Sequence, residues 1–197
     1  KIINGLEDPN GFTRVVRSDK KRKGLLYAGT ETGLYVSNDT GAHWQRLKLN
    51  LPIVPINDLI IQDNDLVAAT SGRGFWILDD LGLLQTMTAN ESSFKLFKPK
   101  DTYRIFGGTS KARGQGKNPK SGVTFDYYLD RAADSLELKL EVLQNLKVIR
   151  TYTNKKPKSF KSWPGGPSKP EILPSTKGYH RFTWDFKRES LPAINKV

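Results

Sequence analysis

The apolar residues of this chain fall in short runs whose alternation is typical of strands rather than helices. Residues 136–143 place an apolar side chain at every second position, with charged residues between them. This alternation predicts a half-buried antiparallel strand, and residues 146–152, which follow the short Gln144-Asn145 turn, are its expected hairpin partner. Further strands are expected at residues 123–129 and 179–186. The pattern therefore predicts an all-β chain.

The first half of the chain contains an internal repeat. Residues 26–30 (LYAGT) recur as LVAAT, at an offset of 66 − 26 = 40, and residues 33–36 (GLYV) recur as GFWI, at an offset of 74 − 33 = 41. A period of about 40 residues is that of a four-stranded blade of a β-propeller. Four strands are expected in each unit: residues 12–17, 25–30, 33–37 and 44–47 in the first, and residues 56–61, 65–70, 74–78 and 83–86 in the second.

One turn of the first unit carries a motif. Residues 37–44 have the sequence SNDTGAHW, which follows the pattern S-x-D-x-G-x-x-W. The four specified positions are Ser37, Asp39, Gly41 and Trp44. The carboxylate can accept hydrogen bonds from amides of the turn, the glycine can adopt the positive φ of a tight hairpin, and the tryptophan can pack over the turn. The second unit has a degenerate copy with Asp80 and Gly82 but without the tryptophan.

The motif and the repeat together resemble the Asp-box (BNR) family of β-propellers, which includes sialidases and sortilin-like (VPS10) proteins. Residues 25–37 and 67–80 are similar to the last blades of large bacterial propellers described as sortilin-like or glycosyl-hydrolase-like. The resemblance implies that residues 1–87 form about two C-terminal blades of an Asp-box β-propeller, in which the Asp-box is a structural turn. Members often have His where this chain has Ser71, so no acid or base is carried over to that loop.

The second half is expected to contain a linker and a second β module. Residues 88–120 are Gly-rich and basic, which is typical of a linker, and a short strand is expected within it at residues 94–97. Residues 121–197 resemble the Ig-like β-sandwich of the flagellar hook-capping protein and of the C-termini of secreted bacterial proteins, because Gly178, Phe182 and Trp184-Asp185 follow the pattern Gly-x-x-x-Phe-x-Trp-Asp. A sandwich usually has about seven strands, so the module is expected to be incomplete.

The predicted fold class is therefore a partial β-propeller of about two blades followed by an Ig-like β-sandwich module. Closed propellers have about 4–8 blades, and an open pair would expose strand edges and apolar faces. We therefore expect this chain to be one segment of an assembly, in which missing blades or another chain complete the sheets.

The sequence offers no recognisable catalytic constellation, and no cofactor or metal is expected. Asp79 and Asp80 are expected to cap a turn rather than to flank a glycosidic bond, which needs two carboxylates about 5–9.5 Å apart. His43 and His180 lack a nearby carboxylate in the sequence and do not have the spacing of metal ligands. The candidate ligand contacts are Arg73, on a loop that could face the central cleft of the propeller, and Trp76.

Because the formal net charge is +12, polyanions are candidate partners. The Lys and Arg residues gather in polar turns and in the Gly-rich segment, without the aromatic residues that read RNA bases, which counts against a nucleic-acid partner. No apolar run approaches the ~18 residues that a membrane-spanning helix needs.

Three functional hypotheses follow. The favoured one is an extracytoplasmic interaction protein that binds a protein or a glycan through its propeller and is non-catalytic in this segment; the location is implied by the resemblance alone. The alternative is a sialidase-like glycoside hydrolase whose active site lies in missing N-terminal blades. The third is a polyanion binder, whose binding would weaken steeply with salt.

Overall fold

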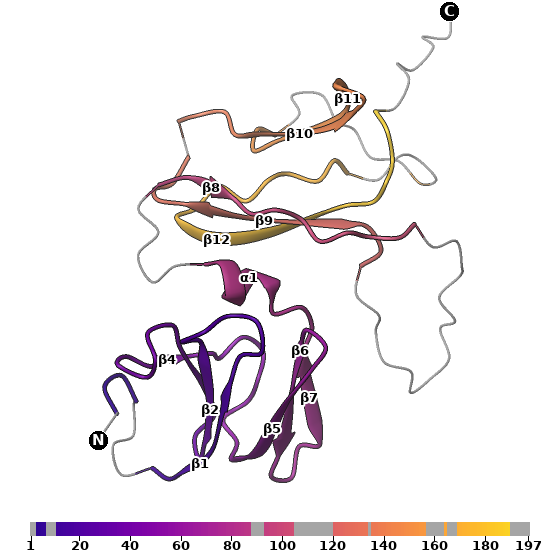
Figure 1. Ribbon diagram of the computed structural model, residues 1–197. Coiled ribbons are helices and arrows are strands. Elements are labelled where there is room, and N and C mark those ends of the chain that lie inside the picture. Colours follow the sequence, from indigo (N-terminus) through magenta and orange to yellow (C-terminus); the bar gives the residue numbers. More distant parts are fainter. Residues whose placement is uncertain are drawn as a thin grey trace, which may run out of the picture. The chain divides into compact units, whose positions relative to one another are not determined.

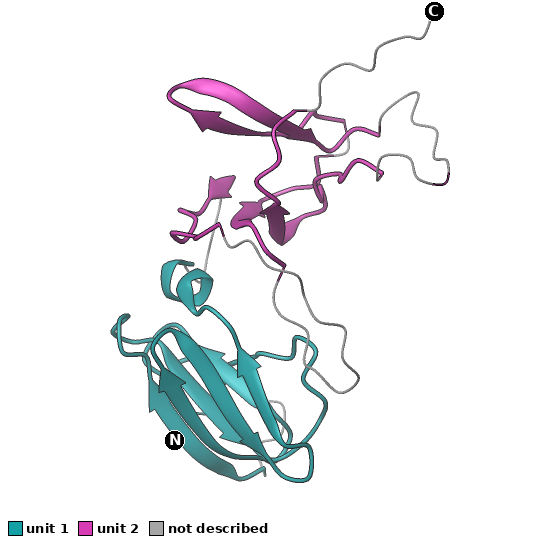
Figure 2. Cartoon of the chain, turned by 90° about the vertical axis from the view of Figure 1, so that its right-hand side faces the viewer, with its two compact units in different colours: residues 1–90 teal, residues 91–197 magenta. Residues whose placement is uncertain are grey.

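The computed structural model describes residues 3–6, 11–87, 93–104, 120–133, 135–156, 164 and 169–189. These residues contain one short helix and are otherwise strands and turns, so the all-β prediction is confirmed. The chain divides into two compact units, Lys1–Asn90 and Glu91–Val197 (Figure 2).

The first sheet is an antiparallel meander of four strands in the order β1-β2-β3-β4 (Figure 1). Its strands are β1 (Thr13–Ser18), β2 (Leu26–Thr30), β3 (Leu34–Ser37) and β4 (Gln45–Arg46). Every residue of β3 is buried, because the second sheet covers one face and a cluster around Trp44 covers the other. Burial on both faces agrees with the continuous apolar run of Leu34, Tyr35 and Val36.

The second sheet is an antiparallel meander of three strands, β5 (Ile56–Gln62), β6 (Asp65–Thr70) and β7 (Phe75–Leu78). It pairs Leu66 with Leu78 and Ala68 with Trp76. The repeat in the sequence is thus a repeat of strands, because β2 and β3 correspond to β6 and β7.

The fourth strand expected at residues 83–86 is wrong, because this segment forms the helix α1 (Gly82–Thr86). The N–H of Gln85 donates to the carbonyl oxygen of Leu81, and the N–H of Met87 donates to that of Leu83. Contacts distant in the sequence hold the helix: the Arg22 guanidinium donates to the carbonyl oxygens of Leu84 at 2.8 Å and Met87 at 2.6 Å. The segment therefore satisfies its backbone without a neighbouring strand.

The two sheets of the first unit pack face to face around one hydrophobic core. The first sheet contributes Tyr27, Leu34 and Val36, and the second contributes Leu59, Ile61, Leu66 and Ala68. The sheets approach closely at Gly29, where a Cβ atom would come within 2.7 Å of the Ile56 side chain of the second sheet, and also within 2.8 Å of Val15 on the neighbouring strand β1. A larger residue would therefore push the sheets apart.

Strands β1 and β5 each contain one extra residue that has no partner on the next strand. The pairing of β1 with β2 shifts between Thr13 and Val15, and the pairing of β5 with β6 shifts in the same way around Asn57. Such β-bulges increase the local twist of a strand. The two extra residues contact each other, because Arg14 Nη1 donates to Asn57 Oδ1 at 3.2 Å.

The second unit has two β layers. One is an antiparallel sheet in the order β12-β9-β8, and the other is a hairpin (Figure 1). The sheet consists of β8 (Lys95–Leu96), β9 (Val123–Leu129) and β12 (Gly178–Trp184), and the hairpin consists of β10 (Lys139–Gln144) and β11 (Lys147–Thr153). Tyr127, Leu140, Tyr152 and Phe182 pack between the layers.

One detail of the second unit differs from the sequence expectation: strand β10 begins at Lys139, so Leu136 lies outside it and is 58% exposed. Strand β8 lies at the short strand expected at residues 94–97 within the linker range, and its Lys95 pairs with Tyr128 of β9. The other linker residues at 88–92 and 105–119, and the module's residues at 134, 157–163, 165–168 and 190–197, lie outside the described residues.

Candidate functional site

The four Asp-box positions lie together at the turn between β3 and β4. Ser37 Oγ donates to Asp39 Oδ1 at 2.8 Å and accepts a hydrogen bond from the N–H of Gly41 at 2.9 Å. Asp39 Oδ1 also accepts a hydrogen bond from the N–H of His43 at 2.9 Å. Gly41 has a φ of 90°, in the left-handed region that glycine adopts without a steric penalty. The polar groups of the motif thus bond to the turn itself.

The sequence expectation that His43 lacks a carboxylate partner is wrong. The turn brings its Nδ1 to 2.6 Å from Asp39 Oδ2. The hydrogen bond from the backbone N–H of His43, followed by those from its side chain and from Ser37, lowers the pKa of the Asp39 carboxyl from 3.8 to about 2. The carboxylate is therefore charged at neutral pH and engaged on both of its oxygens.

Trp44 lies on the face of the first sheet that points away from the second sheet. It is buried and packs against Ala28 and Tyr35, with Leu6 and Leu26 at the edge of this cluster. The backbone N–H of Trp44 donates to the carbonyl oxygen of Asn4 at 2.7 Å. Trp44 therefore joins the Asp-box turn to the sheet and to residues 4–6.

Sequence reasoning missed a polar network centred on Asp19, a buried residue directly after β1. Its carboxylate accepts hydrogen bonds from the N–H groups of Lys21 and Arg22, the Tyr27 hydroxyl and the Gln85 amide of α1. Burial acts to raise the pKa of Asp19, but these four hydrogen bonds outweigh it and hold the pKa below its usual range. An Asp before the turn of residues 20–23 was the available signal, because Asp often bonds to backbone two residues later.

The candidate ligand contact Arg73 lies in the turn between β6 and β7, and Trp76 lies in β7. Trp76 Nε1 donates to the carbonyl oxygen of Arg73 at 3.2 Å. The indole packs against the core between the two sheets, whereas the Arg73 side chain is exposed. The structure therefore brings the two residues together through the backbone, and their side chains lie in different surroundings.

The second sheet exposes an apolar surface on the side that points away from the first sheet. Its register places Ile60 beside Val67, Val67 beside Ile77, and Ala69 beside Phe75. These five residues are named here the outer face. Phe75 is 78% exposed, Ile77 is 60% exposed and Ile60 is 56% exposed, so the apolar row crosses all three strands.

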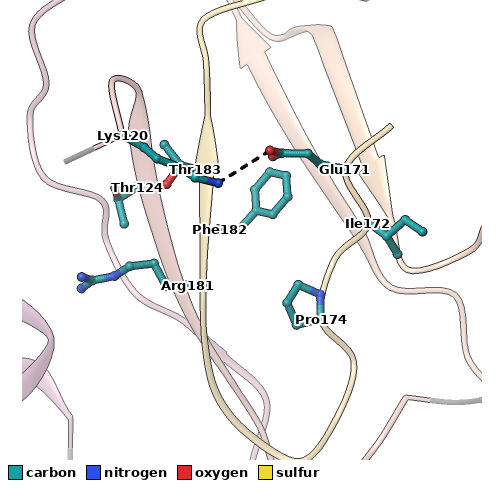
Figure 3. A pocket seen from close by; sticks show the side chains of 8 residues that line it. All are labelled: Lys120, Thr124, Glu171, Ile172, Pro174, Arg181, Phe182 and Thr183. Atoms are coloured by element: carbon teal, nitrogen blue, oxygen red, sulfur yellow. Dashed lines mark ion pairs between the residues drawn. The ribbon is translucent and has the colours of Figure 1, made fainter. Parts of the chain in front are cut away.

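A cavity of about 530 Å³ lies in the second unit (Figure 3). It is lined by Lys120, Thr124, Glu171, Ile172, Pro174, Arg181, Phe182 and Thr183. Lys120 Nζ lies 3.8 Å from Glu171 Oε1, and Arg181 donates two hydrogen bonds to the carboxylate of Asp126. Glu171 is the only carboxylate in this lining, so the cavity does not present the carboxylate pair of a glycosidase.

Asp80 and His180, which the sequence analysis considered as candidates, bond to groups of nearby turns. Asp80 Oδ1 accepts hydrogen bonds from Asn64 Nδ2 and the N–H of Gly82 and has a φ of 59°, which is the geometry of a turn. His180 Nε2 lies 2.6 Å from the carbonyl oxygen of Thr176. Across the described ranges, no three His, Cys, Asp or Glu residues are grouped to hold a metal ion, and no helix is long and apolar enough to cross a membrane.

Comparison with known proteins adds no relative. No protein-family model matches this chain, and neither a curated protein nor a solved structure matches it.

Proposed function

We propose that this chain is a non-catalytic interaction module that binds a protein through the outer face. The observation that carries the proposal is the exposure of Ile60 on β5 and of Phe75 and Ile77 on β7, on either side of the half-buried Val67 and Ala69 of β6. Apolar patches that span several elements of a folded protein mark interaction surfaces.

The sequence of β7 supports the same conclusion. Phe75, Trp76, Ile77 and Leu78 form a continuous apolar run, which is typical of a strand buried on both faces. Trp76 and Leu78 pack against the core between the two sheets, but Phe75 and Ile77 are exposed. Strand β7 therefore has the composition of a buried strand, while one of its faces is exposed among the described residues of the first unit.

The chemistry of the outer face favours a protein over a glycan. Sugar rings stack on flat aromatic surfaces and bond to polar groups beside them, because their hydroxyl groups need partners. The outer face contains one aromatic residue, Phe75, and four aliphatic residues. The charged residue on this side of the sheet, Asp58 beside Ala69, is already paired with Arg17 at 2.7 Å. Branched aliphatic side chains bind the apolar side chains of proteins.

The wider context of the proposal is a propeller-type protein outside the cytoplasm. The Asp-box turn, the 40-residue repeat and the two meanders packed face to face support propeller-type blades. The extracytoplasmic location is supported by the resemblance of the sequence to secreted and surface proteins.

Photo-cross-linking tests this function. Benzoylphenylalanine replaces Phe75 on the outer face or, as a matched control, Leu146, which is 94% exposed on the hairpin of the second unit. Irradiation with envelope proteins of the source cells is expected to give discrete protein adducts from position 75 only, and Ile77→Lys is expected to abolish them. Equal adducts from both positions, or labelling of glycans alone, would contradict the proposal.

A further inference from the structure

The internal repeat shows what kind of surface the outer face fits. Leu34 and Val36 of β3 correspond to Phe75 and Ile77 of β7, because each pair faces corresponding residues of the neighbouring strand. Leu34 is 6% exposed and Val36 is 5% exposed, since both are buried against the second sheet. The outer face is therefore the equivalent, one repeat later, of a face that is already buried in this molecule.

The first sheet also has a face that is equivalent to the buried face of the second sheet. Leu59, Leu66 and Ala68 of the second sheet pack against the first sheet. Their equivalents in the first sheet are Val16, Leu26 and Ala28, because Val16 pairs with Ala28 just as Leu59 pairs with Ala68. Leu59 is 1% exposed, whereas Val16 is 46% exposed.

The first sheet is hollowed on this side. A cavity of about 310 Å³ is lined by Leu6, Thr13, Val16, Leu26, Ala28, Thr40, Gly41 and Trp44, and this cavity is named here the first-sheet hollow. It contains all three equivalents of the buried interface residues. The chain thus has a protruding apolar face at one end of its pair of sheets and a recessed apolar face at the other.

We propose that the outer face of one copy of this chain docks on the first-sheet hollow of a second copy. This inference rests on the proposed function and names the partner. The contact would repeat, between copies, the packing that the molecule makes once within itself, with Phe75 and Ile77 directed into the recess beside Val16 and Trp44.

Such a contact is head-to-tail, because it joins two different surfaces. Heterologous contacts of this kind form rings when the rotation between copies closes and open filaments when it does not. β-Propellers, in which meanders pack face to face around a channel, have about 4–8 blades. Each copy supplies two such sheets, so a closed ring is expected to contain about two to four copies. The charge of +12 on each copy opposes association, and added salt is expected to promote it by screening that charge.

Light scattering coupled to size-exclusion chromatography tests the proposal on the intact chain. The expected mass at high protein concentration and moderate salt is two, three or four times 22.2 kDa. Ile77→Lys blocks the outer face and Val16→Lys blocks the hollow, so each variant alone is expected to be monomeric. Leu146→Lys adds the same charge to the second unit and is expected to assemble as the parent chain does. Circular dichroism checks that each variant is folded.

Mixing the two monomeric variants gives the decisive result. The Ile77→Lys copy keeps an intact hollow and the Val16→Lys copy keeps an intact outer face, so an equal mixture is expected to form a heterodimer and nothing larger. A mixture that stays monomeric, or an Ile77→Lys variant that still assembles, would overturn the proposal. A monomeric parent chain that still gives adducts with another protein from position 75 would overturn self-docking and leave the proposed function intact.

Discussion

At the scale of single residues, the Asp-box stabilises a turn through a carboxylate that is almost wholly engaged by its neighbours. Asp39 bonds to Ser37 and to both the backbone and the imidazole of His43. The hydrogen bonds of Asp39 end on the turn itself, so its role in this chain is local. The carboxylate should therefore affect the stability of the chain in acid.

Acid titration tests this role. The pKa of Asp39 is about 2 in the folded chain and 3.8 ordinarily, so its contribution to stability is complete above about pH 4 and is lost as the pH falls through 2. Asp39→Asn is expected to be less stable at pH 7 and to lack this part of the acid dependence, measured by urea unfolding at several pH values.

The His43→Ala variant separates the two contributions of His43 to the pKa of Asp39. It removes the imidazole and keeps the backbone N–H, which is the larger cause of the shift. The pKa of Asp39, followed by NMR of its carboxyl carbon, should move only part of the way to 3.8. A return to the full ordinary value would show that the backbone hydrogen bond has little effect.

At the scale of elements, the packing of the two sheets depends on the missing side chain of Gly29. A Cβ there would overlap Ile56 and Val15, and the equivalent residue of the second sheet, Ala69, lies on the outer face. Gly29 and Ala69 therefore correspond in the repeat, but only Gly29 is packed against another sheet.

Substitution of each by valine tests this difference. Gly29→Val is expected to destabilise the chain by about 1–3 kcal/mol, because overpacking forces the sheets apart. Ala69→Val, at the equivalent half-buried position on the outer face, is expected to change stability by less than about 0.5 kcal/mol. Urea titration measures the two free energies of unfolding. Both substitutions are made in the Ile77→Lys background, which is expected to keep the protein monomeric. Equal losses at both sites would mean that Gly29 is not at a close approach.

The sequence predicted the strands well where alternation or the repeat determines them and failed where distant residues decide. The repeat located β2, β3, β6 and β7 to within one residue at either end. Residues 83–86 were expected to be a strand because the first unit has one there, but the cap that Arg22 provides to Leu84 and Met87 favours a helix. No local pattern reveals a partner more than 60 positions away.

The candidate site was predictable in part for the same reason. The Asp-box was visible as four residues at fixed spacing, and its contacts lie within one turn. The outer face could not be predicted, because the run from Phe75 to Leu78 is typical of a buried strand. Only the arrangement of the two sheets shows that Phe75 and Ile77 lie on the exposed face and Trp76 and Leu78 on the core face.

At the scale of the whole molecule, self-docking would make stability depend on concentration. Assembly binds the folded chain and not the unfolded one, so mass action raises the apparent stability as concentration increases. The Tm of the parent chain is therefore expected to rise by several degrees over a hundredfold range of concentration, and the Tm of Ile77→Lys is expected to stay constant. Calorimetry measures both, and a parent Tm independent of concentration would contradict self-docking.

The paired bulges of β1 and β5 have a geometric consequence for any such assembly. Arg14 and Asn57 are the extra residues of the two strands, and they bond to each other. A bulge increases the twist of its strand. We therefore expect the angle between neighbouring sheets to depend on these two bonded residues, one in each sheet. The curvature of a stack would then be a property of the backbone at these two positions, and deletion of either residue would change how many sheets complete a full turn while the apolar faces stay the same.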